Sequence, residues 1–165
     1  MQVKYRNERW LVCMLSDLID SEVINLDVEC INWMDAIKKG TELLLNKDYI
    51  EKSYEEAIID NFIKLGPYMV IAPGIVLSHA RHEQGVKRLS LSIITLKNPV
   101  SFGSEMNDPV KLIITLAAID DKSHMKALEE LMGLFMNTED LNSLMIEKDK
   151  EKILMLLNKY SNKAM

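Results

Sequence analysis

The sequence lacks the residue patterns that mark several common classes of protein. Its 165 residues include two cysteines, six glycines and four prolines. Cys13 and Cys30 lie in apolar surroundings without CxxC spacing, so we expect small, reduced core residues. The glycines occur singly, and there is no GxGxxG motif, Walker loop, G-x-S-x-G elbow or H-E-x-x-H motif. These absences remove the usual signatures of nucleotide binding, serine hydrolysis and zinc proteolysis.

No hydrophobic run is long enough to cross a membrane. The apolar run at residues 10–15 follows three basic residues but ends at Ser16 and Asp17, too early for a secretory signal. The 20 Lys and Arg residues against 25 Asp and Glu residues give a net charge of −5. This acidic balance argues against a general binder of nucleic acid or anionic membranes. We therefore expect a soluble, cytoplasmic protein.

The hydrophobic pattern alternates between helical and strand periods, which is typical of an α/β domain. It predicts helices at residues 8–19, 33–46, 51–65 and 123–135, with further helices after Glu139 and after Asp149. Strands are expected at 21–26, 68–71 and 75–77, a half-buried strand at 89–93, and a strand covered on both faces at 110–118. The 11 methionines fall mostly on helical faces, where we expect them to fill the core.

Three histidines remain as candidate chemical groups. His79 follows the strand-like IVLS segment, His82 lies three residues later, and His124 occupies the first turn of a predicted helix. Functional sites of open α/β sheets collect at such strand ends. The histidines are open to three interpretations: structural residues, zinc ligands, or a nucleophile with a phosphate-stabilising partner. A spacing of three fits a zinc site poorly on an extended segment, and no cysteine or carboxylate completes a tetrahedron.

The third interpretation has a clear chemical basis. Neutral imidazole is a competent nucleophile near pH 7, because its reference pKa is about 6.5. A developing phosphoryl charge needs donors aimed at its oxygens, and a helix N-terminus supplies them. His124 fits this supporting role, as do the hydroxyl groups of Ser78 and Ser123.

Residues 66–86, GPYMVIAPGIVLSHARHEQGV, resemble the active-site segment of phosphotransferase-system enzyme IIA domains of the mannitol/fructose superfamily (type 2). The pattern is most similar to the ascorbate-type branch. The resemblance continues through residues 98–135, with a histidine before an L-x-x-L helix, and includes upstream motifs at Trp33 and Tyr54. It therefore extends over most of the chain.

The resemblance implies a single α/β domain over residues 1–165, with a core at about 12–160. Its fold would be a mixed β-sheet flanked by helices in α-β-α layers. It also implies a phosphotransferase in which His79 takes a phosphoryl group from phospho-HPr and passes it to a cysteine of enzyme IIB. His124 would stabilise the phosphoryl oxygens, with Arg81 nearby. No metal or organic cofactor is implied.

The same resemblance leaves some questions open. The IIC permease selects the sugar, so ascorbate is a suggestion at the level of the family only. A homodimer is one option for the oligomeric state. The alternative function is a regulatory IIA-like module, in which phosphorylation controls partner binding without sugar transport.

Three positions depart from the family pattern. Ser78 stands where the family usually has proline, which removes a backbone restraint beside the nucleophile. Asn61 stands where mannitol-type members carry arginine, which lowers the positive potential at the site. His82 replaces a proline of many ascorbate-type members, and is either an added phosphate contact or an exposed loop histidine.

The surface around His79 is expected to dock two successive partners. Ile75 and Val76 are candidates for its apolar contact core. Local positive charge would steer an acidic partner despite the negative net charge, and such steering weakens as salt increases. The candidates for this basic cluster are Arg81, Lys87 and Arg88.

Overall fold

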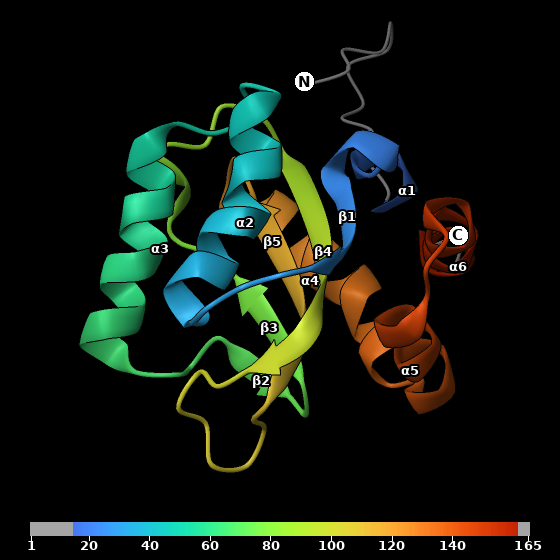
Figure 1. Cartoon of the computed structure of the whole chain (residues 1–165). Helices are drawn as coiled ribbons and strands as arrows, with labels where there is room; N and C mark the ends of the chain where they lie inside the picture. The colour runs from blue at the N-terminus through green and yellow to red at the C-terminus, as the bar shows by residue number, and fades with distance from the viewer. Residues whose placement is uncertain (1–14, 162–165) are drawn as a thin grey trace, which may run out of the picture.

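A computed structural model describes residues 15–161 and shows a five-stranded mixed sheet between two layers of helices (Figure 1). The strand order is β1-β4-β5-β3-β2. β4 pairs antiparallel with β5 and β2 antiparallel with β3, whereas β1–β4 and β3–β5 are parallel. The bounds are β1 (Ile24–Val28), β2 (Val70–Ala72), β3 (Ile75–Ser78), β4 (Ser90–Val100) and β5 (Val110–Ala117). This architecture confirms the expected mixed α/β fold.

The helices divide between the two faces of the sheet. α2 (Trp33–Asn46) and α3 (Lys52–Leu65) cover one face, and α2 packs against β4 and β5 (Figure 1). The other side carries α1 (Leu15–Leu18), α4 (Asp121–Phe135), α5 (Thr138–Ile146) and α6 (Lys150–Ser161), while η1 (Ser21–Val23) and η2 (His82–Gln84) are short 3₁₀ turns. Within the described residues, no helix combines the length and apolar character needed to cross a membrane.

The predicted elements are found, with shifted ends. α2 has the predicted bounds, and α3 starts one residue after the predicted start. The strand expected at residues 21–26 is a 3₁₀ turn followed by β1. Of the helix expected at 8–19, residues 8–14 lie outside the described part of the chain. The periodicity thus located the elements better than it located their ends.

β5 is the central strand, and it is buried along nearly its whole length, as expected. The prediction that β4 is half-buried is wrong, because its side chains are buried on both faces from Ser90 to Leu96. Both alternating serines are buried: the Ser92 hydroxyl donates to the Gly40 carbonyl of α2 at 2.8 Å, and the Ser90 hydroxyl donates to the Arg88 carbonyl at 3.0 Å. A buried hydroxyl with a hydrogen-bond partner is tolerated in a core.

The close contact between α2 and the sheet depends on small side chains. Thr115 of β5 pairs with Ser78 on one side and Ser92 on the other, so these hydroxyl-bearing residues share one face of the sheet. Gly40 lies over this row, and a Cβ atom at Gly40 would be 2.7 Å from the Thr115 Oγ1. Glycine therefore sets how closely α2 approaches the strands.

The expectation that methionines on helical faces fill the core holds for Met34 and Met145, which are partly buried against it, but not for several others. Five methionine side chains are more than half exposed: Met106, Met125, Met132, Met136 and Met155. Cys30 is a free, half-buried thiol packed against the edge of the core, and burial raises its pKa to about 11. Cys13 lies outside the described residues.

Candidate active site

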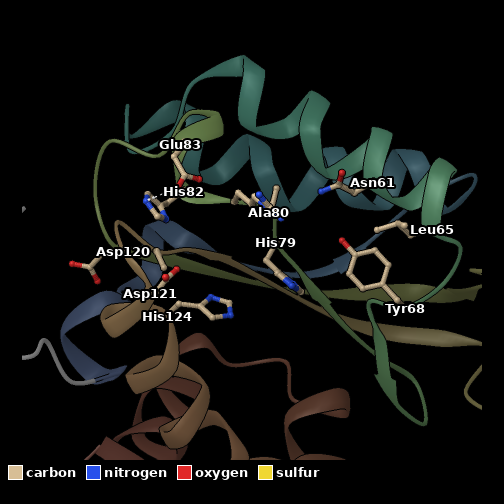
Figure 2. Close-up of a pocket in the computed structure, with 12 residues that line it drawn as sticks. Asn61, Leu65, Tyr68, His79, Ala80, His82, Glu83, Asp120, Asp121 and His124 are labelled. Atoms are coloured by element: carbon tan, nitrogen blue, oxygen red, sulfur yellow. Dashed lines mark ion pairs between the residues drawn. The ribbon is translucent and has the colours of Figure 1, made fainter.

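A cleft of about 540 Å³ opens where β3 and β5 end (Figure 2). Its walls come from α3, from the loop that follows β3, and from the N-terminal turn of α4. The lining residues are Asn61, Leu65, Tyr68, His79, Ala80, Arg81, His82, Glu83, Ala118, Asp120, Asp121 and His124. All three histidines of the sequence therefore line one cleft.

His79 comes directly after β3, where the chain leaves the sheet. Its Nδ1–H donates to the carbonyl oxygen of Leu77 at 2.9 Å. Because a carbonyl oxygen only accepts, this bond places a ring proton on Nδ1. In the neutral imidazole, Nε2 then carries the free lone pair. The local backbone thus selects which nitrogen is available for chemistry.

His124 lies in the first turn of α4, and its ring centroid is 5.6 Å from that of His79. Figure 2 shows the His79 ring between His124 on one side and Tyr68 on the other. Burial lowers the pKa of His124, and the charge of His79 lowers it further, against a smaller opposing effect of Asp121. His124 is therefore neutral near pH 7.

The start of α4 is fixed by a capping box. The Asp120 carboxylate accepts the Ser123 N–H at 2.7 Å, and the Ser123 hydroxyl accepts the Asp120 N–H at 3.3 Å. The hydrogen bonds from Ser123 also lower the pKa of Asp120. Ser123, which we expected near the phosphate, holds the helix that carries His124 and does not line the cleft.

Ser78 is also absent from the cleft wall. Its side chain is fully buried, and its hydroxyl has no hydrogen-bond partner among the described residues. Its pairing with Thr115 places it on the sheet face under α2. Of the expected site residues, the structure therefore brings His79, His124 and Arg81 together, and leaves Ser78 and Ser123 behind them.

Arg81 and His82 line the cleft beside η2. His82 is about one-third exposed, and its Nε2 lies 3.1 Å from the carboxylate of Glu83. It is thus a cleft residue paired with an acid, rather than a freely exposed loop histidine. Because Glu83, Asp120 and Asp121 line the same cleft, the site has mixed charge.

Most of the residues expected to form the docking surface do not line the cleft. Ile75 and Val76 are fully buried in β3, so the prediction that they form an apolar contact core is wrong. Lys87 pairs with Asp48 at 2.7 Å, and the Arg88 guanidinium lies 4.4 Å from the centre of the Tyr49 ring. Neither basic residue lines the cleft, which leaves Arg81 as the member of the predicted basic cluster at the site.

Several cleft residues were not identified from the sequence. Tyr68 lies with its ring centre 6.0 Å from that of His79, nearly perpendicular to it, and its hydroxyl accepts a hydrogen bond from Asn61. Burial raises the pKa of Tyr68. The usable signals were weak: a tyrosine after the Gly66–Pro67 helix stop, and acidic residues after the long strand.

A metal centre has no support in the described structure. Residues 15–161 contain no group of three or more histidine, cysteine or carboxylate side chains that could hold a metal ion. His79 and His82, the pair considered for zinc, use ring nitrogens to contact Leu77 and Glu83 respectively.

Comparison with known proteins identifies the family. Residues 17–160 match the model of "Phosphoenolpyruvate-dependent sugar phosphotransferase system, EIIA 2". The ascorbate-specific EIIA component of Escherichia coli K12 is 36% identical over 143 residues, covering 86% of this chain and 93% of that protein.

Solved structures agree with this match. The mannitol-specific cryptic phosphotransferase enzyme IIA of Escherichia coli has a TM-score of 0.81 and 32% identity, covering 89% of this chain and 99% of that one. The enzyme IIA-Mtl of Escherichia coli, solved in complex with phosphorylated enzyme IIB-Mtl, shares the fold with a TM-score of 0.77, 23% identity, and coverage of 86% and 97%. The chain therefore belongs to the EIIA 2 family of the phosphoenolpyruvate-dependent sugar phosphotransferase system.

Proposed function

We propose that this chain carries a phosphoryl group on Nε2 of His79, taken from phospho-HPr and passed to a cysteine of enzyme IIB. The observation that carries the proposal is the hydrogen bond from His79 Nδ1–H to the Leu77 carbonyl. It directs the free lone pair of the neutral ring to Nε2. Family membership supplies the reaction class.

The transfer is a pair of in-line displacements. The Nε2 lone pair of His79 attacks phosphorus as the bond between phosphorus and a histidine nitrogen of HPr breaks, and that nitrogen keeps the electron pair. In the second step a cysteine thiolate of enzyme IIB attacks phosphorus, and the P–N electron pair returns to Nε2. The Nδ1–H bond to Leu77 stabilises the positive charge that the phosphorylated ring carries.

His124 is the proposed partner of the phosphoryl oxygens. Its ring is close enough to His79 for a ring N–H to donate to the phosphoryl oxygens. The negative charge of these oxygens favours the protonated imidazole of His124. Arg81 adds a permanent positive charge to the same cleft. The two residues together supply donors where negative charge gathers during transfer.

The acidic residues of the cleft suit a carrier rather than a tight phosphate binder. Glu83, Asp120 and Asp121 place three carboxylates in the cleft against the permanent positive charge of Arg81. A group that must be passed on is better held with moderate affinity, because stabilising the bound state raises the barrier to its departure.

Ascorbate is the substrate to test first in transport. The reason is the match to the ascorbate-specific EIIA component of Escherichia coli over most of both chains. We propose that this chain delivers phosphate to a cognate enzyme IIB whose IIC permease recognises ascorbate.

The function is tested with phosphoenolpyruvate, enzyme I and HPr. We expect acid-labile phosphate on the chain, loss of labelling in His79→Gln, and retained labelling in His82→Gln, which keeps the nucleophile. Labelling of His79→Gln at the wild-type rate would contradict the proposal. Adding the cognate enzyme IIB separates the alternatives, since transfer supports the transport carrier and retention of phosphate supports the regulatory module.

A further inference from the structure

The buried tyrosine Tyr54 connects α3 to both strands that end at the cleft. Its side chain is fully buried. The hydroxyl oxygen accepts the Ala80 N–H at 3.0 Å, and the hydroxyl donates to the Leu116 carbonyl oxygen at 2.6 Å. Ala80 directly follows His79, and Leu116 is next to the last residue of β5. One hydroxyl group therefore links the chain just after His79 to the end of β5.

The Tyr54 hydroxyl lies where the next backbone hydrogen bond between β3 and β5 would form. β3 and β5 run parallel, and Ser78 pairs with Thr115. The Leu77 N–H points to the other side, where it donates to the Met69 carbonyl at 2.9 Å. Backbone groups alternate sides along a strand, so the Ala80 N–H faces β5.

In a continued parallel ladder with this register, the Ala80 N–H would bond directly to the Leu116 carbonyl. The Tyr54 hydroxyl instead occupies the space between these two groups and satisfies both. The strands are therefore held apart at Ala80, next to the residue that carries the imidazole. This separation sets where the chain leaves the sheet and where His79 enters the cleft.

We propose that Tyr54 is a positioning residue for His79, acting through the two hydrogen bonds of its hydroxyl. Its effect on phosphoryl transfer rests on the proposed function, whereas its effect on the geometry of His79 does not. Without the hydroxyl, Ala80 and Leu116 either close into a direct hydrogen bond or lose a buried partner. Both outcomes shift His79 relative to His124.

The protonation of Tyr54 supports this role. Burial raises its pKa to about 12. The hydroxyl therefore stays protonated and keeps donating to Leu116 over the range in which histidines titrate.

The test compares Tyr54→Phe with the matched control Tyr160→Phe. Tyr160 of α6 is also buried, and its hydroxyl donates to the Asp140 carboxylate; neither residue lines the cleft. Three measurements are made on each full-length chain: the phosphorylation rate, the ¹⁵N shifts of the His79 ring, and amide exchange at Ala80.

For Tyr54→Phe we expect exchange at Ala80 to be at least about tenfold faster, as local opening requires. We expect altered ¹⁵N shifts for His79 and a phosphorylation rate lower by about 10- to 100-fold, the size of effect that small misplacements produce. Tyr160→Phe should change none of these. If Tyr54→Phe leaves the His79 shifts and Ala80 exchange as in the wild type, the proposal is overturned.

The design separates this proposal from the function itself. A wild-type chain that takes no phosphate refutes the carrier function, while the exchange and ¹⁵N measurements still judge Tyr54. If Tyr54→Phe does not fold, the unmodified chain supplies the test: a slowly exchanging Tyr54 hydroxyl proton with a nuclear Overhauser effect to the Ala80 amide is expected. Absence of that signal while the Ala80 amide is resolved overturns the proposal.

Discussion

The ring centroids of His79 and His124 lie 5.6 Å apart, although His79 follows β3 and His124 lies in the first turn of α4. Each ring therefore responds to the charge on the other. Burial lowers the pKa of His124, and the charge of His79 adds to that effect. A phosphoryl group on His79 would reverse the effect of the His79 charge and raise the pKa of His124, because the phosphoryl oxygens are negatively charged.

We expect phosphorylation to raise the pKa of His124. The measurement is an NMR titration of the His124 ring nitrogens before and after phosphorylation. The control is His79→Gln, in which incubation with the same phosphoryl donors should leave the His124 titration unchanged. A His124 pKa that stays the same or falls on phosphorylation of the wild-type chain would contradict the proposed contact with the phosphoryl oxygens.

The lowered pKa of His124 also predicts a pH dependence of stability. As pH falls below the ordinary histidine value of 6.5, the unfolded chain takes up the proton first. Protonation then favours unfolding, so the free energy of unfolding falls as pH drops through the window below about 6.5. His124→Gln should reduce this slope in urea titrations at several pH values. An equal slope in the two chains would show that His124 is not the group responsible.

Arg81 should control the encounter with an acidic phosphoryl donor. Arg81→Glu replaces attraction with repulsion in the cleft, so the second-order rate of phosphorylation should fall, with a smaller effect at high salt. Lys87→Glu is the matched control, because Lys87 lies outside the cleft and pairs with Asp48. Stopped-flow or quench-flow kinetics at two salt concentrations measure the second-order rate constant of phosphorylation for each chain. Equal effects of the two reversals would place the docking face elsewhere.

Gly40→Ala should destabilise the fold. The new methyl group would meet the Thr115 Oγ1 at 2.7 Å, so α2 or β5 must move. Overpacking of this kind costs roughly 1–3 kcal/mol of unfolding free energy, which chemical denaturation measures. Lys38→Ala, at an exposed position of the same helix, should be nearly neutral. A Gly40→Ala chain as stable as the wild type would show that the helix has room to shift.

The carboxylate of Glu130 should act as a buried acceptor whose charge is unfavourable. It accepts the Leu15 N–H at 2.5 Å, and burial raises its pKa. Since the folded pKa lies above the ordinary value of 4.5, stability is lost as pH rises through the raised pKa. Glu130→Gln keeps an acceptor without the charge, so at pH 7 it should be as stable as the wild type or more stable.

Glu130→Ala is the comparison that removes the acceptor. It should cost about 1–3 kcal/mol, because the buried Leu15 N–H loses its partner. Denaturation of the three chains at pH 5 and pH 7 gives the result. If Glu130→Gln were as destabilised as Glu130→Ala at pH 7, the charge itself would be the stabilising feature.

The amino-acid pattern predicted most of the elements, and the resemblance to the family implied that His79 and His124 act together. That each histidine follows a strand is a local pattern, whereas the parallel pairing of β3 with β5, which brings the two strand ends together, is a long-range contact. The burial of the serine-bearing face of β4 could not be predicted, because alternating serines have the same sequence pattern whether that face is covered by a helix or exposed to solvent. Only the contact of Ser92 with Gly40 distinguishes the two cases.

The positioning of the site was beyond sequence reasoning for a similar reason. The partners of the Tyr54 hydroxyl, Ala80 and Leu116, are far from it along the chain. The serines predicted beside the phosphate illustrate the converse. Ser78 and Ser123 are adjacent to the histidines in sequence, but strand alternation turns one under α2 and helix capping uses the other.

The most direct test of the account is the position of the phosphoryl group on the His79 ring. The chain is labelled with ¹⁵N in its histidines, phosphorylated through enzyme I and HPr, and studied by ¹⁵N and ³¹P NMR. The hydrogen bond from Nδ1–H to Leu77 predicts ¹⁵N–³¹P coupling at Nε2 of His79, with Nδ1 still protonated. Coupling at Nδ1 of His79, or at a nitrogen of His82 or His124, would contradict the central claim.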